Sequence, residues 1–148
     1  MALKITPPIY FFGFLVLMIG LHLFLPVERG MPALIQLVGI GLIAFGITIN
    51  LITDQLFKKH TTTVRPTELP TTFLTSGPFK FSRNPMYLGM ATILFGAAFV
   101  LGTMVSIIPG VLFVLVIDVF FIPVEEKNMK EVFGDTYRHY ARRTRRWF

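Results

Sequence analysis

Four long apolar blocks constrain this chain more than any other feature of its sequence. They cover residues 8–25, 31–52, 85–101 and 104–122, which together make up more than half of the 148 residues. At about 1.5 Å of rise per residue, a helix over each block is roughly 26–33 Å long, close to the ~30 Å hydrocarbon core of a bilayer. An α-helix also satisfies its own backbone hydrogen bonds, as a segment in lipid must. The sequence therefore predicts a single all-α domain over residues 1–148, a polytopic membrane protein with four transmembrane helices.

Composition excludes several other classes of protein. Charged residues make up 15% of the chain, whereas a soluble domain carries about a quarter. The chain has no cysteine, which excludes a disulfide scaffold and a thiolate metal site, and its 16 Phe residues exclude disorder. The net charge of +6 would suit nucleic acid, but the charges avoid the apolar blocks. We therefore expect a membrane-embedded chain with no nucleic-acid partner and no metal.

The first apolar block has the length of a signal sequence but not its flanks. One lysine, Lys4, precedes it, and the segment Leu25-Pro26-Val27-Glu28-Arg29 that follows has no small-x-small cleavage pattern. We therefore expect a retained helix. His22, near the end of this block, has no second histidine placed to pair with it, so we expect it at the membrane interface rather than in a ligand site.

The basic residues predict the orientation of the chain in the membrane. Twelve of the 14 Lys and Arg residues fall in residues 53–84 and 123–148, two regions that four helices place on the same side. The turns on the other side, 26–30 and 102–103, carry only Arg29. Cytoplasmic loops of membrane proteins carry an excess of Lys and Arg. Both termini and the loop 53–84 are therefore predicted to be cytoplasmic, and the membrane is predicted to be a prokaryotic inner membrane.

The cytoplasmic loop 53–84 is long for so small a protein. Its centre is rich in Thr and Pro, which favours extended backbone, and its second half carries apolar side chains that argue for packing. Loops of this length are usually functional or disordered, and we expect functional order. The loop ends at Asn84-Pro85, a typical N-cap followed by proline at the first helical position. The free N–H groups of such a helix start also attract anions.

A C-terminal helical segment is predicted over residues 124–146, after Pro123 and the acidic pair Glu125-Glu126, which suit a first helical turn. An apolar and aromatic stripe at spacings of three and four is typical of a helix lying in the membrane interface. It consists of Met129, Phe133, Tyr137, Tyr140, Thr144 and Trp147. Gly134-Asp135 is expected to interrupt this helix. The tyrosines suit an interfacial aromatic belt, and the basic cluster 142–146 suits topology fixing and contact with anionic lipid.

One acid, Asp118, lies inside a predicted span. Such acids are costly in lipid and usually face a partner or a cavity. Two interpretations stay open. Asp118 packs helices together through Thr, Ser or Asn side chains, with Thr48 and Asn50 as candidates, or it belongs to a functional site on the helix face that carries Glu125 two turns later.

Four motifs follow one another in the second half of the chain. They are Leu74-Thr75-Ser76-Gly77-Pro78-Phe79, Arg83-Asn84-Pro85-Met86-Tyr87-Leu88-Gly89, Glu125-Glu126, and the spaced series Phe133-Gly134, Tyr137, Tyr140, Thr144 and Arg146-Trp147. Together they resemble the isoprenylcysteine carboxyl methyltransferase and phospholipid methyltransferase superfamily of integral membrane enzymes. The likeness covers roughly residues 60–148. Each motif alone is weak, but four in this order, with one helical hairpin between the second and third, are specific.

The resemblance implies S-adenosyl-L-methionine as methyl donor, with S-adenosyl-L-homocysteine as product. The donor would bind on the cytosolic side, between the loop, the start of the third span and the C-terminal helix. The implied cofactor contacts are Thr71, Thr72, Phe73 and Leu74, then Phe79, then Arg83, Asn84, Pro85, Met86 and Tyr87, and finally Glu125, with Glu126 as its close rival. A further upstream contact falls on the backbone of Val64.

Two positions depart from the pattern of many relatives. Asn84 stands where many have His, and it still offers a hydrogen-bond donor and an acceptor. Phe121 stands one turn before the acidic pair, where prenylcysteine enzymes place an Arg that grips the substrate carboxylate, and phospholipid-methylating relatives are apolar there. The resemblance therefore favours a lipid amine or another apolar nucleophile as acceptor, with Phe121 and Asp118 as substrate-site residues.

The predicted function is S-adenosylmethionine-dependent methyl transfer to a lipophilic acceptor, a membrane lipid or a lipophilic small molecule, at the cytoplasmic membrane face. Such a displacement depends mostly on alignment, and an ammonium acceptor must first lose a proton. Glu126 or Tyr87 is predicted to assist such an amine, and Arg83 or Arg146 to hold a carboxylate or phosphate. Two alternatives stay open: a small four-helix transporter with Asp118 as coupling acid, and isoprenylcysteine carboxyl O-methylation.

Overall fold

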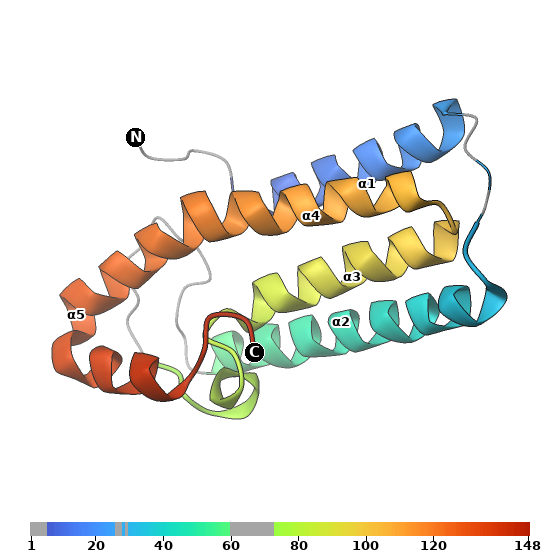
Figure 1. Cartoon of the computed structure of the whole chain (residues 1–148). Coiled ribbons are helices and arrows are strands. Elements are labelled where there is room, and N and C mark those ends of the chain that lie inside the picture. The colour runs from blue at the N-terminus through green and yellow to red at the C-terminus, as the bar shows by residue number, and fades with distance from the viewer. Residues whose placement is uncertain (1–5, 26–27, 29, 60–72) are drawn as a thin grey trace.

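The computed structural model describes residues 6–25, 28, 30–59 and 73–148, which fold into helices (Figure 1). In chain order the elements are α1 (Pro7–Phe24), α2 (Ala33–Lys59), the 3₁₀-helix η1 (Gly77–Lys80), α3 (Pro85–Leu101), the 3₁₀-helix η2 (Met104–Ser106), α4 (Ile107–Val116), the π-helical turn η3 (Ile117–Phe121) and α5 (Ile122–Arg143). The described part of the chain forms no strand, and an isolated bridge pairs Ser82 with Arg145. The all-α prediction is confirmed.

The helix α3 lies at the centre of the bundle, between α2 on one side and α4 on the other, with α1 beside α4 (Figure 1). The core joins apolar side chains from α1, α3, α4, the π-helical turn and the first residue of α5. Its most buried members are Met18, Leu94, Ala98, Phe113, Ile117 and Ile122. Because α3 contributes to this core along its length, its first turn is held in place by the rest of the bundle.

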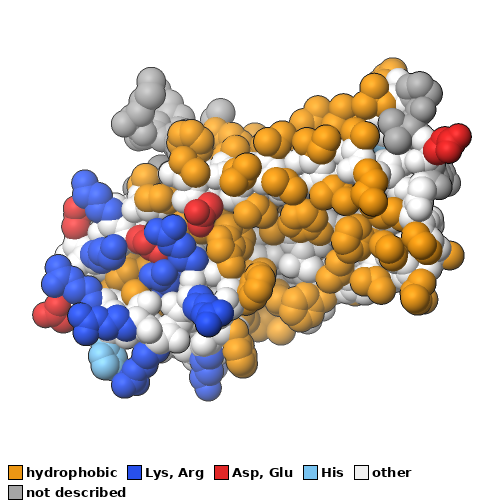
Figure 2. Space-filling model, viewed as in Figure 1, with side chains coloured by type: hydrophobic (Ala, Val, Ile, Leu, Met, Phe, Trp, Pro, Cys, Tyr) orange, Lys and Arg blue, Asp and Glu red, His pale blue; other side chains and the backbone are white. Residues whose placement is uncertain are grey.

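Among the described residues, three helices are long and apolar enough to cross a membrane: α1, α2 and the helix Met104–Arg143. The helix α3 is apolar too but has 17 residues, so its predicted crossing stays a prediction. Apolar side chains cover the bundle in Figure 2, while Lys and Arg gather at the end where α5 lies. A soluble monomer rarely exposes so large an apolar surface. This surface is the one expected of an integral membrane protein.

The helices α2 and α3 approach closely through glycines spaced seven residues apart. A Cβ added to Gly46 would lie 2.5 Å from the carbonyl oxygen of Gly89, and one added to Gly39 would lie 2.6 Å from that of Gly96. Small residues let helix backbones approach closely in membranes. The α2–α3 contact therefore fixes the end of α2 against the start of α3.

The second helix is longer than predicted. It continues through residues 53–59, which the sequence assigns to the loop. The buried Thr53 donates its hydroxyl to the carbonyl of Ile49 at 2.8 Å, and Asp54 pairs with Lys58 one turn later at 2.6 Å. Because these polar groups are satisfied inside the helix, the helix does not end where the apolar block ends. The connection to α3 is correspondingly shorter than 53–84, and residues 60–72 of it lie outside the described residues.

The predicted break between the fourth span and the C-terminal helix is wrong. The helix runs on from α4 through the π-helical turn into α5 without a gap at Pro123, so the predicted C-terminal helix, found as α5 at Ile122–Arg143, continues the fourth span. Pro123 has no N–H to donate to the carbonyl four residues earlier, and the helix widens into a π-helical turn over Ile117–Phe121 just before it. The predicted interruption at Gly134 is confirmed. Its φ of 51° and ψ of −123° are backbone values that residues with a side chain avoid, and they kink the helix.

The kink at Gly134 turns the end of α5 back toward the start of α3 (Figure 1). After Arg143 the chain becomes extended, and the amide of Arg83 donates to the carbonyl of Arg145 at 2.9 Å. The tail of the chain thereby lies beside the segment that precedes α3. The polar segments of the sequence, namely the segment before α3, α5 and the C-terminal tail, therefore lie at the same end of the bundle.

Candidate active site

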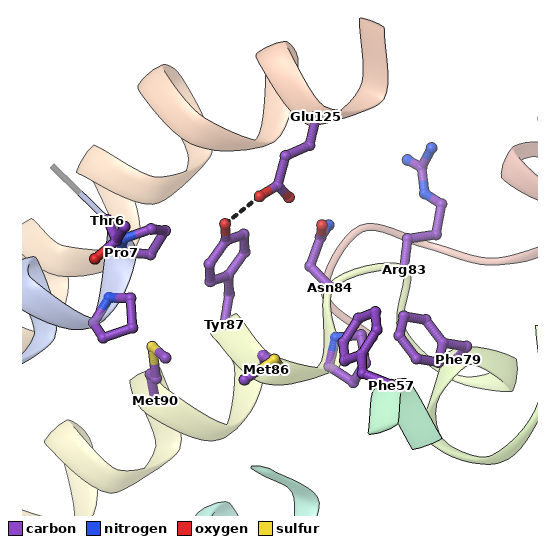
Figure 3. A pocket seen from close by; sticks show the side chains of 12 residues that line it. Thr6, Pro7, Phe57, Phe79, Arg83, Asn84, Met86, Tyr87, Met90 and Glu125 are labelled. Atoms are coloured by element: carbon purple, nitrogen blue, oxygen red, sulfur yellow. Dashed lines mark hydrogen bonds between the residues drawn. The ribbon is translucent and has the colours of Figure 1, made fainter. Parts of the chain in front are cut away.

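A cavity of about 250 Å³ opens at this end of the bundle (Figure 3). Its walls come from the start of α1, the last turn of α2, η1, the start of α3 and the start of α5. The lining residues are Thr6, Pro7, Pro8, Phe57, Phe79, Arg83, Asn84, Pro85, Met86, Tyr87, Met90 and Glu125. Most of this wall is apolar, and its polar groups lie mainly on one side. Such a mixture of apolar surface and few polar groups is typical of a small-molecule site.

The first turn of α3 supplies the floor of the cavity. Pro85 occupies the first helical position, as predicted, because its missing N–H has no intrahelical acceptor there. Asn84 stands at the N-cap position, but its side chain makes no capping hydrogen bond, contrary to the prediction. Its amide instead donates to the carbonyl of Arg146 at 3.1 Å. The Asn84 side chain thus ties the helix start to the C-terminal tail.

Glu125 reaches into the cavity from α5 and meets Tyr87 from α3 (Figure 3). The phenol of Tyr87 donates a short hydrogen bond to Oε1 of Glu125. Tyr87 is 7% exposed, so the pair sits where apolar side chains exclude most of the water. A carboxylate and a phenol in such surroundings interact more strongly than they would in water.

Glu126, the next residue, is buried in a different set of contacts. Arg146 donates from Nε to Oε1 at 2.9 Å and from Nη2 to Oε2 at 3.0 Å, a bidentate pair, and Arg83 lies 3.2 Å from Oε1. The hydrogen bond to Glu126 raises the pKa of the Arg146 guanidinium above its usual value, so Arg146 stays charged. The Glu126 carboxylate therefore pairs with two guanidinium groups at once, those of Arg146 and Arg83.

Arg83 joins this ionic cluster to the cavity. It lines the cavity and contacts Glu126 through Nη2. Within the described part of the chain, its buried Nε has no hydrogen-bond partner. A buried guanidinium N–H that lacks a partner is costly, and a carboxylate or phosphate ligand in the cavity would supply one.

The aromatic residues of α5 pack on the segment before α3. Phe73 stacks on Phe133 with ring centroids 5.2 Å apart and meets the edges of Tyr137 and Tyr140. The phenol of Tyr140 donates to the carbonyl of Phe79 at 2.5 Å. Tyr137 is buried and Tyr140 is half-buried in these contacts, so both tyrosines also hold the segment that carries the cavity wall, and their place in an interfacial belt stays a prediction.

Asp118 has partners other than those proposed from the sequence. The indole N–H of Trp147 donates to its Oδ1 at 3.1 Å, and Nη1 of Arg146 lies 3.6 Å from the same oxygen. Thr48 instead donates to the carbonyl of Ala44 in its own helix, and the Asn50 side chain lies against Gly89. The sequence could not predict this arrangement, because Trp147 and Asp118 are 29 residues apart in the chain and meet only where the tail folds back.

The residues predicted for the cofactor and for catalysis divide into three groups. Seven line the cavity together, namely Phe79, Arg83, Asn84, Pro85, Met86, Tyr87 and Glu125. Four described ones do not line it: Phe73 and Leu74 pack behind it, and Glu126 and Arg146 form the ionic cluster. Thr71, Thr72 and Val64 lie outside the described residues.

The two residues predicted for the substrate site are not brought to the cavity. Phe121 is 3% exposed and packs edge-on against Tyr10 with ring centroids 5.2 Å apart, in the hydrophobic core. Asp118 belongs to the contacts of the tail. Phe121 is thus a core residue, and it is not among the residues that line the cavity.

Sequence reasoning missed five residues that line the cavity. They are Thr6, Pro7, Pro8, Phe57 and Met90. Met90 lies one helical turn after Met86, so the helical period carried a signal for it. Phe57 could not be predicted as a lining residue, because the sequence assigns its segment to the loop. The start of α1 carried no local signal, since only the packing of the bundle brings it here.

Comparisons with known proteins bear on this site. The phospholipid methyltransferase family matches residues 34–136, from the start of α2 to just past the kink in α5. A protein of Haemophilus influenzae (strain ATCC 51907 / DSM 11121 / KW20 / Rd), described as uncharacterized, is 39% identical over 62 residues, which are 42% of this chain and 98% of that protein. No solved structure matches the chain. Because the family match covers most of the chain and most of the cavity-lining residues, the chain belongs to the phospholipid methyltransferase family.

Proposed function

We propose that this protein transfers a methyl group from S-adenosylmethionine to the amine of a membrane lipid at the cytoplasmic face. The observation that carries the proposal is the Tyr87–Glu125 pair in a mainly apolar cavity, in a chain of the phospholipid methyltransferase family. The cytoplasmic face is supported by the basic residues, which gather at the end of the bundle that holds the cavity.

The residues present in the cavity fit S-adenosylmethionine. Arg83 offers a buried Nε that lacks a partner in the described chain, which suits the carboxylate of the cofactor. Phe79 and Phe57 offer aromatic faces for an adenine ring, and their own rings meet edge-on at 5.7 Å. Asn84 adds an amide, and Glu125 a carboxylate that suits hydroxyls or positive charge. S-adenosylmethionine would supply an electrophilic methyl group on a sulfonium.

The chain's own groups then have two tasks. The apolar walls align the reacting groups and exclude water, which is the main requirement of an in-line displacement. An ammonium headgroup must also lose a proton before its nitrogen can attack, and Glu125 is the cavity carboxylate placed to accept it. Tyr87 orients Glu125 through its hydrogen bond. Glu126 is less suited to this task because Arg83 and Arg146 already neutralise it.

Labelled methyl transfer from S-adenosylmethionine tests this proposal. Protein in detergent is given phosphatidylethanolamine or a farnesylcysteine analogue, and the radiolabel in each product is counted. We expect saturable methylation of the amine lipid. Glu125→Gln should lower kcat by about 10²-fold or more, the usual contribution of a general base, and Tyr87→Phe should lower it by about tenfold through loss of a charge-assisted hydrogen bond.

Tyr10→Phe is the matched control, because Tyr10 packs against Phe121 in the core and does not line the cavity. It should leave kcat unchanged. Methylation of the farnesylcysteine carboxylate alone would reject the amine acceptor and support isoprenylcysteine O-methylation. Methylation of neither acceptor, together with no binding of S-adenosylhomocysteine, would reject the methyltransferase proposal.

A further inference from the structure

The last residues of the chain form a strap across the segment that leads into α3. We define the strap as residues 144–147. Its backbone runs extended from Thr144, at φ −118° and ψ 130°, and Arg145 pairs with Ser82. The carbonyl of Arg146 accepts hydrogen bonds from the Ser82 hydroxyl and the Asn84 amide, both at 3.1 Å. The strap is thus bonded to the two residues that flank Arg83.

The side chains of the strap contact a second region of the protein, the π-helical turn and the start of α5. Arg146 makes its bidentate pair with Glu126 and lies 3.6 Å from Asp118. Trp147 donates its indole N–H to Asp118 at 3.1 Å and packs against the hydrophobic core. Arg142, Arg143 and Arg145 are exposed, whereas Arg146 is half-buried and pairs with Glu126 and Asp118. The strap therefore bridges the start of α3 and the start of α5.

The two regions that the strap contacts, the segment before α3 and the start of α5, carry polar residues of the cavity wall. Arg83 and Asn84 line the cavity and are held through Glu126 and through the strap carbonyls. Glu125 lines it from the residue next to Glu126. No strap residue is among those that line the cavity. The strap can therefore influence a ligand only by holding the residues that contact it.

We infer that the strap is a positioning element for the methyl-donor site, with the Trp147–Asp118 hydrogen bond as its anchor. Trp147 and Asp118 are positioning residues, and neither contacts the cavity. When the anchor is lost, the strap undocks more often, and Arg83 and Asn84 lose their fixed orientation. The apparent affinity for the donor then falls by the fraction of molecules in which the strap is docked. This inference rests on the proposed function, since it names the supports of that same site.

The anchor also gives Asp118 a role that the sequence left open. An acid in an apolar helix is retained only where a partner compensates it. Here both hydrogen-bonding and ionic partners come from the strap. Coupling of ion transport would require Asp118 to exchange protons or ions freely, whereas these contacts hold it in place.

Fluorescence tests docking directly, because Trp147 is the single tryptophan of the chain. In purified wild-type protein in detergent, Trp147 should show low quenching by acrylamide. Asp118→Ala should increase the quenching and shift the emission to longer wavelength. Asp54→Ala is the matched control: Asp54 is also a helical acid with a basic partner, and its side chain is 38% exposed against 37% for Asp118. The control should quench like the wild type.

Binding of S-adenosylhomocysteine, measured by calorimetry on the same samples, tests the link to the site. Asp118→Ala and Trp147→Phe should each raise its Kd by about tenfold, the scale of one charge-assisted hydrogen bond. The double variant should bind no more weakly than Asp118→Ala alone, because Asp118→Ala already removes the hydrogen bond that Trp147→Phe removes. Saturating S-adenosylhomocysteine should also reduce quenching of Trp147 in the wild type, since coupling between two equilibria is reciprocal. Circular dichroism confirms that each variant keeps its helix content.

The results separate this inference from the proposed function. Wild-type protein that binds no S-adenosylhomocysteine rejects the donor site itself and with it the positioning role. Binding with an unchanged Kd in Asp118→Ala and Trp147→Phe rejects the positioning role alone. Unchanged quenching in Asp118→Ala rejects the anchor, whatever the binding result. Additive losses in the double variant would show that the two residues act separately, which also overturns the anchor.

Discussion

At the scale of single residues, two adjacent glutamates have acquired different partners. Glu125 lies in the cavity wall with a phenol, whereas Glu126 lies behind the wall between two guanidinium groups. Their order in the sequence gives no basis for assigning these partners. One helical step of about 100° turns the two side chains toward different neighbours. The pair therefore combines a group that can act on a ligand with a group that holds the fold.

Glutamine substitutions should separate the two roles. Glu126→Gln leaves Arg83 and Arg146 without their shared anion, so we expect the free energy of unfolding to fall by about 2 kcal/mol or more, somewhat below the range for a fully buried pair because Arg146 is partly exposed. Glu125→Gln should change the free energy of unfolding much less and weaken S-adenosylhomocysteine binding, because Glu125 lines the cavity. Thermal unfolding followed by circular dichroism, and calorimetric titration, measure the two effects.

Two results would contradict this division. One is equal stability of the Glu126→Gln variant and the wild type, which would mean that the ionic cluster contributes nothing net to the fold. The other is normal S-adenosylhomocysteine affinity in a Glu125→Gln, Glu126→Gln double variant, which would remove both acids from the donor site.

At the scale of elements, the contact between α2 and α3 sets the geometry of the site. The glycine pairs allow the two backbones to touch, and the last turn of α2 then places Phe57 against Phe79, beside the first turn of α3. The kink at Gly134 does the same for the other wall, because it directs the tail back to the start of α3. The first contact uses glycine where a Cβ would collide with the facing helix, and the kink uses it where the backbone angles disfavour any residue with a side chain.

The α2–α3 contact predicts opposite effects for two glycines of the same helix. Gly46→Ala places a Cβ 2.5 Å from the Gly89 carbonyl, so we expect a loss of about 1–3 kcal/mol in the free energy of unfolding. A Cβ at Gly41 has nothing within 4 Å, so Gly41→Ala should raise stability by up to about 1 kcal/mol through helix propensity. Thermal unfolding of both variants in one detergent decides the matter. A Gly46→Ala variant as stable as Gly41→Ala would contradict the close contact.

The kink predicts a local effect of Gly134→Ala. A Cβ there meets nothing within 4 Å, so its cost comes from the backbone values alone, about 1–3 kcal/mol of strain. The helix should relieve the strain by straightening, which would carry the strap away from the start of α3. Acrylamide quenching of Trp147 should therefore increase. Quenching like that of the wild type would show that the strap docks without the kink.

At the scale of the whole molecule, charge and apolar surface divide the protein into two zones. Apolar side chains cover the bundle, and Lys and Arg gather at the end that holds the cavity (Figure 2). Such an arrangement lets a polar donor enter from water while a lipid acceptor remains in the bilayer. The proposed reaction requires access from both phases at one end of the protein.

The charge distribution predicts that this end is cytoplasmic. A green fluorescent protein fused after Phe148 should fluoresce in bacterial cells, and alkaline phosphatase fused there should be inactive, because the positive end stays inside. A phosphatase fused at residue 103, in the opposite turn, should be active. The reverse result for the two phosphatase fusions would place the cavity outside the cytoplasm and exclude an intracellular methyl donor.

The sequence by itself determined the helical class, most helix positions and half of the site. Length and hydropathy suffice for α1 and α3, because an apolar helix in lipid is fixed by local backbone bonding. The run from Arg83 to Tyr87 is contiguous, so one helix start carries all of it into the cavity wall. Local rules misplaced the end of α2 and predicted a break before α5, because Thr53, Asp54 and Pro123 favour helix ends only where no neighbouring turn accommodates them.

The tertiary structure alone decided which groups meet across long separations. It placed Trp147 on Asp118, Arg146 on Glu126 and the start of α1 beside the cavity. These contacts depend on a kink at one glycine and on close packing at others, which fix directions that no helical period records. A side chain's partner is set by where the backbone turns as well as by its own chemistry. For that reason Asp118 and Phe121 resembled site residues in the sequence but form an anchor and a core contact in the fold.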